Sequence, residues 1–210
     1  MRRPRFIAAQ ARHAKGPLGR LIASIMARET WAENQRAIEA LGINEGDRIL
    51  DVGCGHGRSL AVLAARAPKG RVTGVDPSAL MVDIAVRRNR DLVKARRVTV
   101  AMAEVDALPF PDSSIDKALC VHVLYFWDSL DAGLREIARV LKPGGRLALV
   151  FRSAADERAV AAFPKDIYRF PTETAVTSAL EAAGFIIDRS ESCDEPRPQG
   201  PALVTATRCG

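Results

Sequence analysis

Three glycines within five residues stand where the chain could hold an anion or a cofactor. The stretch "ILDVGCGHGRSL" (49–60) places them directly after an apolar run. Glycine loops of this kind join a strand to a helix whose first backbone N–H groups can face a phosphate. The dinucleotide fingerprint G-x-G-x-x-G, however, requires a third glycine where this chain has Arg58. The loop alone leaves two interpretations open, a cofactor cradle and a tight turn.

Two further side chains with chemical potential follow apolar runs. Asp76 ends "RVTGVD" (71–76), where a carboxylate can accept hydrogen bonds from two ribose hydroxyls, although Pro77-Ser78 also make it a candidate helix cap. His122 lies at the end of "IDKALCVHV" (115–123) and titrates near neutral pH, which suits a general base. The alternative is a histidine that hydrogen bonds fix at a strand end.

The elements that must position these residues alternate between short β-rich runs and longer amphipathic ones. Such alternation predicts a mostly parallel sheet with helices on both faces, and a ligand site beyond the carboxyl ends of the strands, where the strand order reverses. The pattern predicts strands at 48–53, 71–76, 98–104, 115–123, 146–151, 185–190 and 202–208, and helices at 58–67, 78–97, 130–141 and 172–184.

The N-terminal part, residues 1–46, is predicted to form a cap on the domain of residues 47–210. Residues 1–15 are expected to be a loose basic arm. Gly16-Pro17 can begin a helix whose apolar residues form one stripe, and Thr30 with Glu33 matches the capping box of a second helix. The first 28 residues hold seven Lys or Arg and no Asp or Glu, so this part could attract an anionic partner or be a solvated arm.

Composition bounds the remaining possibilities. The 210 residues, with 48% hydrophobic and 27% charged residues, suit one soluble globular domain. No apolar run reaches the length of a membrane span or of a signal peptide core, so a cytoplasmic protein is expected. The cysteines are scattered without a CxxC pair, which favours reduced thiols and predicts no metal site; they are Cys54, Cys120, Cys193 and Cys209.

Four motifs in one order carry a specific resemblance. D-x-G-x-G-x-G (51–57), the strand-end Asp76, "ALPFPDSSID" (107–116) and "RVLKPGGRL" (139–147) together resemble the class I S-adenosylmethionine-dependent methyltransferases, most closely the small type 11 branch. The resemblance covers residues 48–151. It implies a doubly wound, mostly parallel, seven-stranded Rossmann-like sheet with an antiparallel last strand, N-terminal lid helices, and S-adenosyl-L-methionine as cofactor.

The resemblance also implies which positions hold the cofactor. Asp76 would bind both ribose hydroxyls, with Pro77 and Met81 against the adenine. Glu104 would meet the exocyclic amine of adenine beside the backbone N–H of Val105, with Asp106 as the alternative. The methionine moiety would be held by Asp51, by the backbone of Gly53, Cys54 and Gly55, and by the backbone at Cys120.

The expected activity is methyl transfer to a small-molecule or lipid-like acceptor by in-line displacement. His122 is the candidate base. Tyr125 and Phe126 could pack over the sulfonium or the acceptor, or belong to the core, and Tyr168 could form part of the acceptor wall. No D-P-P-Y or N-P-P-Y follows the strand predicted at 115–123, and a nucleic-acid substrate is not expected. The apolar stripe within residues 16–28 could fold over the cofactor as a lid or lie on an anionic membrane.

Three other functions stay open at this point: a non-catalytic S-adenosylmethionine-binding regulatory module, an RNA or protein methyltransferase, and a nucleotide-dependent oxidoreductase.

Overall fold

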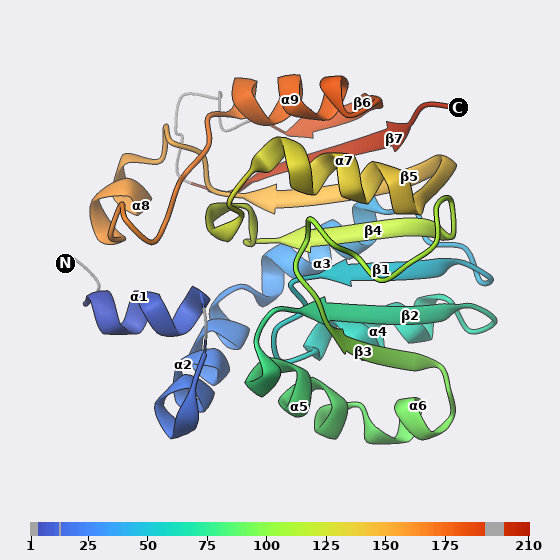
Figure 1. Ribbon diagram of the computed structural model, residues 1–210, viewed down its shortest axis with the longest axis horizontal. Coiled ribbons are helices and arrows are strands. Elements are labelled where there is room, and N and C mark those ends of the chain that lie inside the picture. Colours follow the sequence, from blue (N-terminus) through green and yellow to red (C-terminus); the bar gives the residue numbers. More distant parts are fainter. Residues whose placement is uncertain (1–3, 13, 192–199) are drawn as a thin grey trace.

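The computed structural model describes residues 4–12, 14–191 and 200–210, and it is built on a seven-stranded sheet (Figure 1). The strand order is β3-β2-β1-β4-β5-β7-β6. Adjacent strands from β3 to β5 run parallel, whereas β7 is antiparallel to both β5 and β6. This confirms the predicted mostly parallel sheet with an antiparallel last strand. The strands are β1 (Arg48–Val52), β2 (Arg71–Asp76), β3 (Val98–Met102), β4 (Ile115–Val121), β5 (Leu141–Phe151), β6 (Phe185–Glu191) and β7 (Ala202–Arg208).

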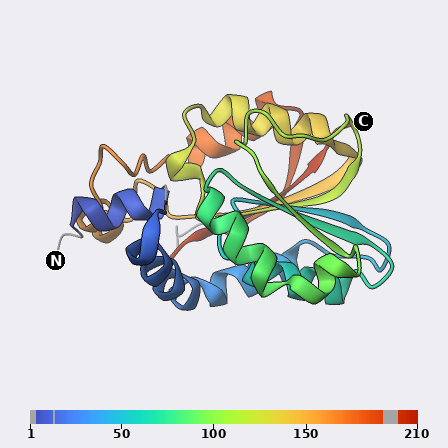
Figure 2. The same cartoon turned by 60° about the horizontal axis from the view of Figure 1, so that its bottom comes forward.

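Helices cover both faces of the sheet (Figure 2). Because successive side chains of a strand point to opposite faces, β4 contributes Ala118 and Cys120 to one apolar core cluster and Leu119 to the other. The first cluster also holds buried residues of α7 (Leu130–Val140) and α9 (Glu173–Ala182). The second holds those of α3 (Trp31–Ala40) and α4 (Arg58–Arg66). A sheet buried on both faces explains the near-continuous apolar runs of the central strands.

The N-terminal arm is helical where it was predicted to be loose. Residues Arg5–Arg12 form α1, which precedes α2 (Gly16–Glu29), and both lie beyond the carboxyl ends of the central strands (Figure 1). The arm orders because it has something to pack against: Ala8 is buried in the first core cluster, and Arg5 pairs with Asp166. The side chain of Thr30 makes no capping hydrogen bond, so the predicted capping box does not form.

The long helix predicted at 78–97 is divided in two at Asn89. Helix α5 (Ala79–Arg88) ends there and the short α6 (Arg90–Lys94) begins. The buried Asn89 amide donates hydrogen bonds to the carbonyls of Ala85 (2.9 Å) and Gly57 (2.8 Å). The break therefore fastens α5 to the glycine loop.

Pro143 and Gly144 of the "RVLKPGGRL" motif lie inside the long strand β5, as a bulge against β4. Gly144 has φ +75°, the positive value that a type II turn requires after proline. Two short helices complete the chain, the 3₁₀ turn η1 (Leu124–Phe126) after β4 and α8 (Glu157–Ala162) after β5.

Within the described residues no helix is long and apolar enough to span a membrane. The same residues hold no group of three or more His, Cys, Asp or Glu side chains placed to bind a metal ion. Cys54, Cys120 and Cys209 are free thiols, and Cys193 lies outside the described residues.

Candidate active site

A cavity of about 390 Å³ opens at the carboxyl edge of the sheet. It lies between β1 and β4, the neighbours at which the strand order reverses. The cavity wall includes these residues predicted from the sequence: Asp51, Gly53, Cys54, Gly55, Asp76, Pro77, Met81, Glu104, Val105, Asp106, His122 and Phe126. The structure thus brings most of the predicted set together, while their roles in binding remain predictions.

The three glycines of the loop serve different purposes. All have positive φ, from +53° to +72°, which L side chains rarely adopt. A Cβ on Gly53 would lie 2.3 Å from Val123, and one on Gly57 would lie 2.7 Å from the Cβ of Ala85 on α5. A Cβ on Gly55 would meet nothing within 4 Å. Gly53 and Gly57 therefore allow close packing, and Gly55 keeps the cavity open.

Asp76 is a buried part of the cavity wall and not a helix cap. Its two carboxylate oxygens accept backbone N–H bonds from Gly55 (3.0 Å) and Ser78 (2.9 Å). The N-cap of α5 is Ser78, whose hydroxyl accepts from the Met81 N–H and donates to the Ala14 carbonyl at 3.1 Å. The turn after β2 is thereby joined both to the glycine loop and to the segment between α1 and α2.

Asp51, at the carboxyl end of β1, is a carboxyl group in an apolar setting. It is buried and accepts a hydrogen bond from the Ser59 hydroxyl on α4. Burial raises the pKa of Asp51 to about 7, further raised by the nearby charge of Asp76 and opposed by the Ser59 bond. A positively charged ligand group beside it would favour the ionised form.

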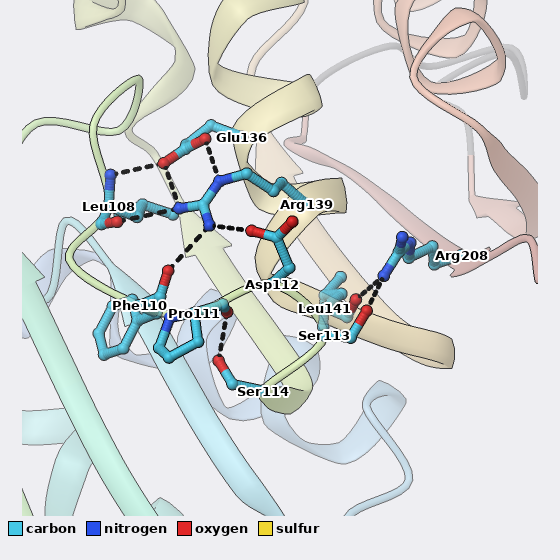
Figure 3. A network of polar contacts seen from close by, with 10 residues as sticks. All are labelled: Leu108, Phe110, Pro111, Asp112, Ser113, Ser114, Glu136, Arg139, Leu141 and Arg208. Carbon is cyan, nitrogen blue, oxygen red and sulfur yellow. Dashed lines mark hydrogen bonds and ion pairs between the residues drawn. The ribbon is translucent and has the colours of Figure 1, made fainter.

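The loop after β3, which carries Glu104 to Asp106, is held from α7. Arg139 donates to the carbonyls of Leu108 (3.1 Å) and Phe110 (2.9 Å) and pairs with Asp112 and Glu136 (Figure 3). Glu136 in turn accepts the Leu108 N–H at 2.8 Å. The "ALPFPD" and "RVL" motifs are thus two halves of one polar network that fixes the loop.

His122 occupies a strained position directly after β4. Its φ is +58°, and its backbone N–H donates to the Val150 carbonyl at 2.8 Å. The Nδ1 atom lies 2.9 Å from the Tyr125 hydroxyl. Burial, and then the charge of Arg152, lower the pKa of His122 to about 4, so the ring is neutral at pH 7.

Three predicted site residues do not line the cavity. Cys120 lies within the core, where β4 faces α7. Tyr125 and Tyr168 are buried behind Phe126, and the ring centroids of Phe126 and Tyr168 are 4.8 Å apart. These tyrosines support the aromatic wall from behind, because η1 turns Phe126 and Trp127 into the cavity instead.

The N-terminal helices add residues that the motif pattern does not identify. Gln10, Ala14, Trp31 and Asn34 line the cavity beside Arg58, whose guanidinium carbon lies 3.9 Å from the Trp31 ring centroid. Arg58 stands where the dinucleotide fingerprint requires a third glycine. This departure from the fingerprint is the one feature of the sequence that could have identified a residue of this part of the wall. Of the α2 side chains that the structure describes, none lines this wall.

Comparison with known proteins agrees with the geometry. The family model described as "Methyltransferase domain" matches residues 50–149. The uncharacterized methyltransferase YdaC of Bacillus subtilis (strain 168) is 33% identical over 77% of this chain and 83% of its own length. A demethylmenaquinone methyltransferase of Tropheryma whipplei (strain Twist) is 38% identical, over 61% of this chain and about half (51%) of its own length.

Among solved structures, the crystal structure of a SAM-dependent methyltransferase from Aquifex aeolicus superposes with a TM-score of 0.69 at 26% identity. The superposition covers 83% of this chain and 89% of that one. The chain accordingly belongs to the S-adenosylmethionine-dependent methyltransferases and has their Rossmann-like class I fold.

Proposed function

We propose that this methyltransferase acts on a small, largely apolar or lipid-like acceptor by in-line displacement. The observation that supports this most directly is the cavity wall after β4, which is formed by Val121, Val123, Phe126 and Trp127 with two polar side chains among them, His122 and Asp128. Such a wall suits an apolar molecule with few polar atoms, because each buried polar atom of a ligand needs a hydrogen-bond partner.

The residues fit S-adenosylmethionine at the ribose end. A carboxylate offers about four lone-pair positions. The two backbone N–H bonds to Asp76, one on each oxygen, orient its carboxylate in the cavity wall, where its oxygens can accept from ribose hydroxyls. The open space over Gly55 gives the backbone of the loop access to the methionine part.

The other predicted contacts suit their partners by type. Asp51 can accept from the ammonium group of the methionine part, and Pro77, Met81 and Val105 offer apolar surface to the adenine. When bound, the cofactor supplies a methyl group on a positively charged sulfur. The chain's own task is then to exclude water and to hold the acceptor atom in line with the carbon–sulfur bond, since orientation provides much of the acceleration.

The names of relatives favour a small acceptor over a macromolecule. Demethylmenaquinone, the substrate in the name of the Tropheryma whipplei relative, is an apolar molecule of the proposed kind. Because this chain spans only about half (51%) of that relative, we propose the same kind of acceptor for this protein and not demethylmenaquinone itself.

The proposal is tested by incubating the protein with radiolabelled S-adenosylmethionine and a cell extract fractionated into metabolites, lipids, RNA and protein. Label should enter a product that partitions into organic solvent. Gly55→Leu protein, which should not bind the cofactor, is the control. Label in RNA or protein would contradict the proposal, and transfer to no fraction would favour a non-catalytic binding module.

A lipid-like acceptor has separate support on helix α2. Leu18, Leu21 and Ile25 recur on one face of this helix and are exposed, and Ile22 alone of the described stripe is buried. The stripe predicted to fold over the cofactor therefore points largely to solvent. Together with the basic N-terminal sequence, this face suits contact with an anionic membrane that stores the acceptor.

A further inference from the structure

The hydrogen bonds around Tyr125 determine where the proton of the His122 ring resides. The Tyr125 hydroxyl receives the backbone N–H of Arg152 at 2.5 Å and lies 2.9 Å from His122 Nδ1. A backbone N–H can only donate, so in the first of these bonds the hydroxyl oxygen is the acceptor. The proton of the Tyr125 hydroxyl therefore takes part in a different hydrogen bond.

That proton needs an acceptor, because the Tyr125 side chain is 3% exposed and an unpaired buried donor is costly. Among the described residues, the remaining group within hydrogen-bond reach of the hydroxyl is His122 Nδ1. Tyr125 therefore donates to Nδ1, and a neutral imidazole that accepts at Nδ1 carries its own proton on Nε2.

His122 lines the cavity, and no described residue forms a hydrogen bond with Nε2. Nε2 is not one of the fully buried side-chain atoms that lack a partner, so it is accessible to a ligand in the cavity that the ring lines. The left-handed backbone at φ +58° is what brings a side chain at the end of β4 to this place. Strain of this kind is retained where the surrounding structure over-determines it, often at functional sites.

We propose that His122 presents Nε2–H as a hydrogen-bond donor to an oxygen atom of the methyl acceptor, and that Tyr125 is the positioning residue that fixes this tautomer. The acceptor part of this inference rests on the proposed function, and the tautomer does not. Because Nε2 already carries a proton, it can donate a hydrogen bond but cannot accept a proton from the methyl acceptor. This differs from the base predicted from the sequence. The fitting acceptors carry an enol, phenol, carbonyl or carboxylate oxygen near the methylated atom.

The tautomer is tested first, by long-range ¹H–¹⁵N correlation on protein labelled with ¹⁵N-histidine at pH 7, with the His122 signals assigned from their loss in His122→Ala. Nδ1 should resonate as an unprotonated nitrogen and Nε2 as a protonated one. A proton on Nδ1 would overturn the proposal. The measurement needs neither cofactor turnover nor a known acceptor, so it stands even if the proposed function fails.

The positioning role of Tyr125 is tested by Tyr125→Phe, which removes the hydroxyl and keeps the ring. The His122 nitrogens should shift towards each other as both tautomers become populated. Tyr168→Phe is the matched control: it removes another buried hydroxyl of the same aromatic cluster, and it should leave the His122 signals in place. An unchanged tautomer in folded Tyr125→Phe would contradict the role.

The donor role is tested with two probes of similar shape, 2-naphthol and 2-methylnaphthalene, on protein saturated with S-adenosylhomocysteine. The naphthol should bind about fivefold more tightly, the factor that corresponds to one hydrogen bond of about 1 kcal/mol. The preference should vanish in His122→Ala protein that still binds S-adenosylhomocysteine. Equal binding of the two probes by the wild type, or binding of neither, would refute the donor role.

Discussion

Asp51 shows at the scale of one residue how the fold prepares a site for charge. The sequence places this carboxyl group at the end of a central strand, and the sheet then buries it. Burial disfavours the charged form of Asp51 and raises its pKa to about 7. A ligand with an ammonium group would supply a cationic partner.

The affinity for S-adenosylhomocysteine is expected to fall in acid. Binding the ammonium group requires ionised Asp51, so below about pH 7 the ligand must first displace a proton. Affinity should fall roughly tenfold per pH unit below that value. Isothermal titration calorimetry between pH 8 and pH 5.5 measures it. Asp51→Asn should bind weakly with a flat profile, and a flat profile in the wild type would contradict the role given to Asp51.

Substitution of Gly55 should separate binding from folding. In Gly55→Leu the side chain enters the open cavity and should abolish S-adenosylhomocysteine binding, while the positive φ costs roughly 1–2 kcal/mol of stability. Gly184→Leu is a matched control, because Gly184 also has a positive φ (+85°) and free space but lies outside the cavity. It should lose similar stability by thermal unfolding and keep full affinity. Retained affinity for S-adenosylhomocysteine in Gly55→Leu would refute the proposal that the glycine loop holds the cofactor.

The sequence predicts the cofactor side of this site better than the acceptor side. Asp51, the glycines and Asp76 lie at or just after the carboxyl ends of strands. Because parallel strands end at the same edge of a sheet, the sequence predicts that these residues lie close together. Whether Tyr125 or Phe126 enters the cavity depends on the 3₁₀ turn η1 and on the left-handed His122, which no local pattern indicates.

At the scale of elements, the network of Arg139 explains why two distant motifs occur together. Helix α7 packs on one face of the sheet, and Arg139 in its last turn fixes residues 108–112 of the loop through carbonyls and carboxylates (Figure 3). The planar guanidinium group is suited to this, because it offers five N–H donors in a rigid arrangement that lysine lacks.

Arg139→Lys should therefore loosen that loop while the charge is kept. Hydrogen exchange should accelerate over residues 104–112 but not in the sheet, and affinity for S-adenosylhomocysteine should decrease several-fold. Hydrogen–deuterium exchange with mass spectrometry measures the first effect. Arg87→Lys, in an exposed ion pair with Asp83 on α5, should change neither. Unchanged exchange in Arg139→Lys would show that other contacts hold the loop.

The alternation of strands and helices was predictable over residues 47–210, since it follows from periodicity and glycine or proline boundaries. Helix α1, the break at Asn89 and the short helices η1 and α8 were not predicted. Helix α1 depends on burial of Ala8 by distant parts of the chain, and the break at Asn89 depends on a hydrogen bond to Gly57. Contacts between segments remote in sequence decided both.

At the scale of the whole molecule, the N-terminal helices give the protein two different sides. Residues on either side of α2 line the cavity, while the outward face of α2 exposes leucine and isoleucine. We propose that this apolar face, in a segment rich in arginine, contacts a lipid surface.

Vesicle flotation tests that contact. The protein should float with vesicles of anionic phosphatidylglycerol and less with neutral phosphatidylcholine vesicles. Leu18→Gln with Leu21→Gln should reduce flotation several-fold. Ile186→Gln is the control, because Ile186 is equally exposed but lies on the edge strand β6. Flotation unaffected by the leucine changes would exclude α2 as the contact.

The hydrogen bond from Ser78 to the Ala14 carbonyl bears on how fast the site exchanges its contents. We expect release of the spent cofactor to require movement of the segment around Ala14, which lines the cavity. Among the described residues, the polar contacts of that segment include this bond, of about 1 kcal/mol, and exposed ion pairs such as Arg20 with Asp83, which contribute little. Burial of Ala8 and Ile22 on either side holds the segment as well, so the residence time of a ligand should depend on how much of this apolar surface must be uncovered.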